Sequence, residues 1–265
     1  GTQKISGLGF EPKVVIFWNT RVGSLNANAV HMMLGLGAAA GIGSGDQASI
    51  SHADEDGEAT SNNRRDQLWS EAIVNTVGTA DASGEEGEVT AKDSDSFTIT
   101  WNKITTNARY FAYKAIGGSD ITDVNMSKIT SPGEIGPVDY DIDFQPDALM
   151  VFGAYMSVSE DANSVTPRQC IGFYDGTNQY CAAIGMNDNV GTTVTGRRFF
   201  SDRIHGHTQP GSEDTLVQVE ATAFLADGYR LDHKSISTRR FFVLAIKGGQ
   251  WEVINDTEPV SDTTK

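Results

Sequence analysis

Short runs of alternating apolar and polar residues, bounded by Gly, Asn and Asp, follow one another along the whole chain. The clearest run is residues 97–101, where every second residue is apolar, as in a strand with one buried face. Residues 14–18 are instead continuously apolar and rich in β-branched side chains, which predicts a strand buried on both faces. No stretch keeps a helical period over three turns. The pattern therefore predicts an all-β protein.

The pattern also repeats, with an offset that slips only from 134 residues near the start to 131 near the end. The recurring elements, in chain order, are Phe10 with Pro12 and Phe144 with Pro146, Arg64 with Arg65 and Arg197 with Arg198, and finally Arg109 and Arg240. Ordered matches with a small slip are typical of two copies of one domain that differ by short loop insertions. A copy of about 130 residues is long enough to bury its own core.

The predicted architecture is two tandem antiparallel β-sandwich domains, jelly-roll-like and related by internal duplication. We expect the first domain at residues 1–130 and the second at 131–255, packed side by side through their linker. An exposed tail is expected at 256–265, where Asp and Thr predominate. In each copy an alternating strand is followed by a second strand that ends in Gly-Gly, which predicts one hairpin of the same length per copy.

The charge of the chain limits its partners. It carries 35 acidic and 20 basic side chains, a formal net charge of −15. Nucleic acid requires a dense Lys/Arg patch, and anionic membranes repel an acidic surface, so we expect neither as a partner. No apolar run reaches the ~18 residues of a membrane span, and we expect no signal peptide at the start.

The two cysteines, Cys170 and Cys181, lie on either side of an Asp-Gly pair, the strongest short signal for a hairpin. A two-residue turn at Asp175-Gly176 would place the two cysteines opposite each other across the hairpin. This register allows either a disulfide or two small buried thiols.

Two segments carry residue types that bind metals. Asp54, Asp56 and Glu58 offer oxygen ligands at the density of a calcium loop, but their spacing departs from the EF-hand. A turn rich in Asp usually satisfies its own backbone, so no metal is predicted there. His205 and His207 could present two imidazoles on one side of a strand. Neither Cys nor a third His is near them in sequence, which favours an exposed polar loop.

The recurring arginines allow two interpretations. Arg offers a planar fork of donors that could clamp an acidic neighbour or a sugar carboxylate. The favoured interpretation is an internal salt bridge within each sandwich, because copies of a domain retain residues that determine the fold. We therefore expect Arg109 and Arg240 at equivalent places beside carboxylates of their own domain.

The repeated units resemble a group of structural proteins from tailed viruses of bacteria and archaea. In that group a Gly-Phe-x-Pro motif followed by an apolar strand likewise begins each of two tandem units. The segments that carry the resemblance are residues 7–18, 59–65, 96–101 and 108–118. The second copy departs from the motif, because Asp143 replaces the glycine before Phe144.

The resemblance implies a virion component such as a head decoration, turret or fibre protein. We expect a non-enzymatic structural protein on the exterior of a tailed-virus particle, with no catalytic residue and no cofactor. Consistent with this, the chain has no Gly-x-Ser-x-Gly motif, and none of its five histidines recurs at matching positions in the copies. The alternative is a tail-fibre or receptor-binding module for a host-surface glycan, which exposed aromatic residues in one concave patch would favour.

The expected partners are copies of the chain itself and other virion proteins, such as the major capsid protein. Virion proteins of this kind form symmetric oligomers, and we expect a trimer or a pentamer. Residues 32–43 are uncharged and rich in Gly and Ala, which makes them a candidate contact between copies. Ala39 is the test position within this segment.

Overall fold

The fold of the protein is given by a computed structural model, which describes residues 1–26, 28–29, 31–76, 83–156, 165–192, 194–210, 215–236 and 238–254. Nineteen strands and one short 3₁₀ turn, η1 (Ser44–Asp46), make up the regular structure of these residues. This confirms the all-β prediction. In the described part of the chain no helix has the length and hydropathy needed to cross a bilayer. The expected tail at 256–265 lies outside the described residues.

The first half of the chain forms two antiparallel sheets. Sheet A has the strand order β1-β8-β7-β6, with β1 (Thr2–Ser6), β6 (Ile73–Thr76), β7 (Ser83–Asp93) and β8 (Ser96–Lys103). Sheet B has the order β5-β4-β3-β2-β9, with β2 (Pro12–Asn19), β3 (Met32–Ala39), β4 (Gln47–Glu55), β5 (Asn62–Leu68) and β9 (Phe111–Gly117).

The second half repeats this arrangement. Sheet D has the order β11-β18-β17-β16, with β11 (Gly136–Asp141), β16 (His205–Thr208), β17 (Thr215–Leu225) and β18 (Gly228–His233). Sheet C has the order β15-β14-β13-β12-β19-β10, with β10 (Ile121–Thr130), β12 (Ala148–Met156), β13 (Arg168–Tyr174), β14 (Gln179–Met186), β15 (Thr195–Phe200) and β19 (Arg240–Gly248). Apart from β10, the strand order of the two halves is the same.

Strand β10 belongs to the second half by its pairing. It precedes the expected boundary at residue 130, yet it is hydrogen-bonded along its length to β19 of sheet C. In pairing terms the second sandwich therefore begins at Ile121. The residues Pro132 and Gly133, which suggested a later boundary, lie in the turn between β10 and β11.

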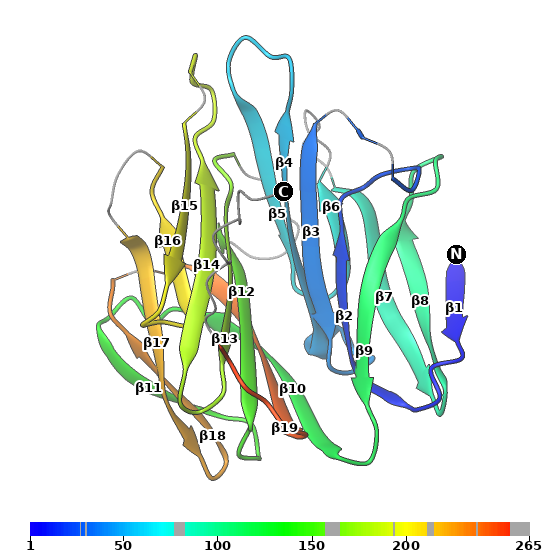
Figure 1. Ribbon diagram of the computed structural model, residues 1–265, viewed down its shortest axis with the longest axis vertical. Coiled ribbons are helices and arrows are strands. Elements are labelled where there is room, and N and C mark those ends of the chain that lie inside the picture. The colour runs from blue at the N-terminus through cyan, green and yellow to red at the C-terminus, as the bar shows by residue number, and fades with distance from the viewer. Residues whose placement is uncertain are drawn as a thin grey trace, which may run out of the picture.

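The four sheets stack in the order A, B, C, D, from right to left in Figure 1. Each pair of neighbouring sheets encloses an apolar core. The core between A and B includes Val15, Phe17, Phe97 and Ile99; the core between C and D includes Val151, Val219, Tyr229 and Phe241; the core between B and C includes Val14, Ile50, Phe152 and Phe242. The two sandwiches thus meet through a full sheet-to-sheet core and not only through a linker.

Strand β2 explains this stacking. Its residues Val15 and Phe17 face sheet A, while Val14 and Ile16 face sheet C. Successive side chains of a strand point to opposite faces, so a continuously apolar strand can serve two cores. The prediction of a strand buried on both faces is confirmed for residues 14–17, whereas Trp18 is exposed.

Two details of the predicted connections are wrong. Strands β8 and β9 were expected to form a hairpin, but β8 lies in sheet A and β9 in sheet B, and β18 and β19 are divided in the same way between sheets D and C. The alternation of a strand shows that one face is buried and says nothing about which strand pairs with it. Most neighbours within each sheet are consecutive strands, as in a meander, which differs from a jelly roll; the exceptions are β1-β8, β2-β9, β10-β19, β12-β19 and β11-β18.

The two halves also share an irregularity. The pairing register of β7 with β8 shifts between Val89 and Ala91, and that of β17 with β18 shifts between Ala221 and Ala223, 132 residues later. One strand has an extra residue at each place, as in a β-bulge. The common strand order and the common bulge are what duplication requires; common ancestry itself stays a prediction.

A glutamine side chain closes each bulge. The Gln47 amide donates to the Val89 carbonyl at 2.9 Å and accepts from the Val89 N–H at 2.6 Å. Gln179 makes the same two bonds with Ala221, at 3.2 and 2.9 Å. Val89 and Ala221 each lie two residues beyond the last residue that pairs with β6 or β16, so the glutamine side chains take the place of the missing strand partner.

We expect Gln47→Ala to lower the free energy of unfolding by about 1–3 kcal/mol, because it leaves both peptide groups of Val89 without their partner in a buried place. Gln47 is fully buried. Urea unfolding followed by tryptophan fluorescence measures the loss. Exposed Gln250 gives the control Gln250→Ala, which should leave the midpoint within experimental error. Equal midpoints for the two variants would contradict a structural role for the amide.

Candidate functional site

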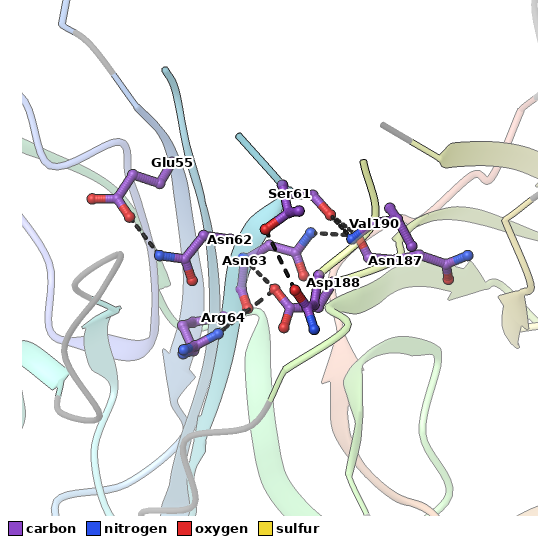
Figure 2. A network of polar contacts seen from close by, with 10 residues as sticks. Glu55, Ser61, Asn62, Asn63, Arg64, Asn187, Asp188 and Val190 are labelled. Atoms are coloured by element: carbon purple, nitrogen blue, oxygen red, sulfur yellow. Dashed lines mark hydrogen bonds and ion pairs between the residues drawn. The ribbon is translucent and has the colours of Figure 1, made fainter. Parts of the chain in front are cut away.

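The β4–β5 turn of the first sandwich meets the β14–β15 turn of the second, and the two turns form a polar clasp (Figure 2). Backbone bonds join them: Ser61 N–H donates to the Val190 carbonyl at 3.0 Å, and Asn189 N–H donates to the Ser61 carbonyl at 2.7 Å. The Ser61 hydroxyl adds a bond to the Asn187 carbonyl at 2.9 Å. The clasp therefore pairs the two sandwiches as two short strands would.

Asp188 reinforces the clasp from the second sandwich. Its carboxylate accepts from the Asn63 N–H at 2.7 Å, and Arg64 lies 3.7 Å away as an ion pair. The Asn63 amide donates to the Asn187 carbonyl at 2.9 Å. Arg64 was expected to pair within its own sandwich. It pairs across the boundary, because the two turns meet.

Asp54, Asp56 and Glu58 line an open hollow of about 790 Å³ beside the clasp. The pKa of Asp54 is raised by partial burial, by the nearby Asp188 and by Asp56. His31 also lines this hollow and accepts the Asp56 N–H at 3.0 Å. The structure thus brings the three candidate carboxylates together, but among the described residues nothing besides the acidic groups themselves indicates a cation.

A second cluster at the boundary gathers arginines around Tyr155, at the end of β12. The guanidinium carbons of Arg239, Arg168 and Arg65 lie 4.2, 5.0 and 5.6 Å from the centre of its ring. Arg65 also donates to the Ala154 carbonyl at 3.2 Å, so it too contacts the second sandwich. Burial, followed by repulsion from the other two arginines, lowers the pKa of Arg65 to about 10.

The other recurring arginines do not share one role. Arg197 and Arg198 are exposed, with Arg198 over the Phe200 ring at 5.0 Å. Arg109 lies 3.9 Å from Glu85 of its own sandwich, as expected. Arg240 instead stacks over Trp69 of the first sandwich, 4.3 Å from the ring centre. The expectation of equivalent carboxylate partners is therefore wrong for Arg240.

Glu85 is the centre of a third site, at one end of the first sandwich. Its nearly buried carboxylate accepts from Arg21 at 2.9 Å, Asn75 at 3.2 Å and Thr105 at 2.5 Å. A hollow of about 310 Å³ opens beside it, and its further lining includes Trp101, Tyr110 and Phe111. Polar groups beside aromatic rings suit the binding of a sugar.

The fourth site is buried between sheets C and D. Cys170 on β13 lies 2.8 Å from Nδ1 of His205 and 3.9 Å from Nε2 of His207, both on β16. All three residues are buried. The prediction that the two histidines lie in an exposed loop is therefore wrong. Their i, i+2 spacing points both to the same side of a strand, toward the neighbouring sheet.

Burial determines the protonation states in this site. It lowers the pKa of His205 to about 3 and the pKa of His207 well below its ordinary value. It also raises the pKa of the Cys170 thiol, as does contact with Cys181. At neutral pH the site holds uncharged imidazoles and a neutral thiol.

Cys170 and Cys181 are both free and buried, and they are not opposite each other. Cys170 pairs with Ala183 and Cys181 with Gly172, because the hairpin loop has four residues, 175–178, and not two. Asp175 causes the longer loop, since its carboxylate accepts from the N–H groups of Thr177 and Asn178 at 2.9 and 2.7 Å. Of the two alternatives left open by the sequence, the structure has the two buried thiols.

Comparisons add no relatives to this description: no protein-family model matches the chain, and neither a curated protein nor a solved structure is significantly similar to it. The sequence missed the association of Cys170 with the histidines, because 35 residues separate Cys170 from His205. The one available signal was the i, i+2 spacing of His205 and His207, which would place both imidazoles on one side if the segment were a strand.

Proposed function

We propose that the chain is a structural, non-enzymatic component of the exterior of a tailed-virus particle. The observation that carries the proposal is the continuous four-layer stack, in which a shared core and a polar clasp join two sandwiches into one block. A block with four ordered layers resists deformation and presents its loops at fixed positions, which suits a surface component of a particle. The resemblance of residues 7–18 and 108–118 supports the same class of protein.

The proposed partners are further copies of the chain and other virion proteins, such as the major capsid protein. The contact expected at residues 32–43 needs correction, because Ala39 is fully buried in the core between sheets A and B. The start of the same strand is exposed: Met32 is 42% and Leu34 37% accessible, and Trp18 on the neighbouring strand is 42% accessible. We propose that these three side chains, the β2–β3 patch, contribute to a trimer or a pentamer.

We expect Leu34→Glu to convert this oligomer to monomers, because a carboxylate cannot be desolvated in the contact without a partner. Sedimentation velocity of the purified chain at micromolar concentration measures the change. Ile135→Glu is the matched control, since Ile135 is also exposed and lies outside the patch. A wild-type chain that sediments as a monomer, or a Leu34→Glu variant that stays oligomeric, would argue against this contact.

The location on the particle requires its own experiment. Antibodies raised against the purified chain should label the outer surface of intact particles of the virus that encodes it. Labelling only after the particles are disrupted would place the chain inside and overturn an exterior role. Absence of the chain from gradient-purified particles would overturn the virion assignment.

A second candidate function is recognition of a host-surface glycan, as in a tail fibre. The hollow beside Glu85 favours it, because Trp101, Tyr110 and Phe111 line a concave site together with Arg109. Quenching or enhancement of tryptophan fluorescence by an acidic oligosaccharide, abolished in Trp101→Ala, would support this function over a purely structural one. An unchanged signal would leave the structural proposal in place.

A further inference from the structure

We propose that Cys170, His205 and His207 form a buried zinc site, with Cys181 as the fourth ligand. The site is independent of the proposed function. It would cross-link β13 and β14 of sheet C to β16 of sheet D and so fasten the two layers of the second sandwich.

The geometry fits a single ion. One ligand atom from each of Cys170, His205 and His207 lies within 4.8 Å of the others. Ligands at zinc distances of about 2.0–2.3 Å in a tetrahedron lie roughly 3.3–3.8 Å apart. The observed separations from the Cys170 sulfur, 2.8 and 3.9 Å, bracket that range, so small side-chain rotations complete the site.

Cys181 lies beside the group of three and outside its 4.8 Å limit, so a side-chain rotation would bring it in as the fourth ligand. It packs with Cys170 in one buried cluster. It also lies 3.9 Å from the carbonyl of Gly206, the residue between the two histidines. A Cys₂His₂ set is a common ligand set of structural zinc sites, which are closed and tetrahedral.

The first sandwich shows that the fold does not need these residues. Ile73 of β6 occupies the position that His205 has in β16, since Ile73 pairs with Gly87 of β7 and His205 with Val219 of β17. Two residues further on, Asn75 occupies the position of His207. Each pair is 132 residues apart, the offset of the common bulge. Ile73 fills its position as an ordinary core residue, with 2% of its surface accessible. The second sandwich instead buries imidazoles there.

Those imidazoles are costly to bury without a ligand. Nε2 of His205 and Nδ1 of His207 are buried and have no hydrogen-bond partner among the described residues. Zinc would bind the other nitrogen of each ring, Nδ1 of His205 and Nε2 of His207, which face Cys170. A buried polar atom without a partner reduces stability, and the free energy of zinc binding would offset that cost.

Charge balance favours two thiolates. The ring of Tyr155 lies 5.2 Å from that of His207, and the three arginines of the boundary cluster pack over it. A metal centre with a net positive charge would be repelled by these guanidinium groups. Zinc with two thiolates and two neutral imidazoles has no net charge. Binding forms two Zn–S and two Zn–N bonds, displaces the water ligands of aqueous zinc and releases two thiol protons to solvent, with no change of oxidation state.

The test uses the full chain, refolded with excess zinc and a thiol reductant, because the buried site can fill as the protein folds. After gel filtration we expect one zinc per chain by elemental mass spectrometry. The His205→Ile/His207→Asn variant places the residues of the first sandwich in the second and should fold without zinc, as circular dichroism can verify. His31→Gln, a control outside the cluster, should keep one zinc.

Cobalt gives a second readout. Refolding with Co²⁺ should produce a thiolate-to-cobalt charge-transfer band and tetrahedral d–d bands in the wild type. The charge-transfer band should weaken in Cys181→Ala, and Cys170→Ala should lose binding altogether. A wild-type chain that refolds without zinc, or a double histidine variant that keeps it, would overturn the proposal.

Discussion

Phe242→Ala should lower the free energy of unfolding by about 3–5 kcal/mol, the range typical of a fully buried aromatic residue that leaves a cavity. Phe242 is fully buried in the core between sheets B and C. Its ring lies 5.3 Å from Phe152 of sheet C and 5.9 Å from Trp69, which follows β5 of sheet B. Removing it opens a cavity that both sandwiches line.

Urea unfolding measured by circular dichroism and by tryptophan fluorescence tests this expectation. Since the core is shared, both signals should shift to lower urea together. Phe199→Ala removes a ring that is 56% accessible and should change stability by less than about 1 kcal/mol. A variant in which only one sandwich melts early, while the other keeps its midpoint, would contradict a common core.

Gly172→Ala should be the second large effect, a loss of about 3 kcal/mol or more, because no side chain fits at this position. A methyl group there would come within 1.8 Å of the Ile204 carbonyl oxygen. Gly37 of the first sandwich has the same environment, because a methyl group added there would come within 2.2 Å of the Ala72 carbonyl oxygen. In each sandwich the chain that enters the small sheet crosses directly over this glycine, so relief requires a backbone shift.

Chemical denaturation of both alanine variants measures the effect, with Gly191→Ala as the control. An added methyl group at Gly191 meets nothing within 4 Å, so its stability should stay within about 0.5 kcal/mol of the wild type. If Gly172→Ala behaved like Gly191→Ala, the close crossing of β16 over β13 would be disproved.

The strands and their repetition could be predicted from the sequence because they depend on local patterns. Alternation at Phe97 and Ile99 reflects one buried face, and both residues are fully buried. Phe97 and Tyr229 occupy matching core positions, as expected, while Phe10 is only partly buried and Phe144 is buried. A local pattern shows which residues of a strand are buried and how they alternate with exposed ones. The two halves share this alternation.

The arrangement of the sheets could not be predicted in this way. An apolar side chain such as Val14 has the same sequence signature whether it faces sheet A or sheet C. The choice of partner strand is also not local, which is why β8 and β9 were wrongly joined. Ala39 shows the same limit, since small uncharged residues suit a subunit contact and a tight core equally well.

The candidate sites were predictable only in part. Asp54 and Asp56 do line one hollow, because they lie in one turn. Arg64 and Arg65 serve the boundary between sandwiches, since the stacking of B on C brings Asp188 and Ala154 to them. Residues that are distant in sequence meet only in the tertiary structure. The spacing of residues within a short motif does not predict such contacts.

A three-dimensional image of the intact virus particle is the most direct test of a structural role on its exterior. A structural exterior component predicts four-layered β density of this shape on the outer surface, repeated around a rotation axis, with the β2–β3 patch at a contact. Density for the chain inside the particle, or none on a particle whose other proteins are all located, would contradict it.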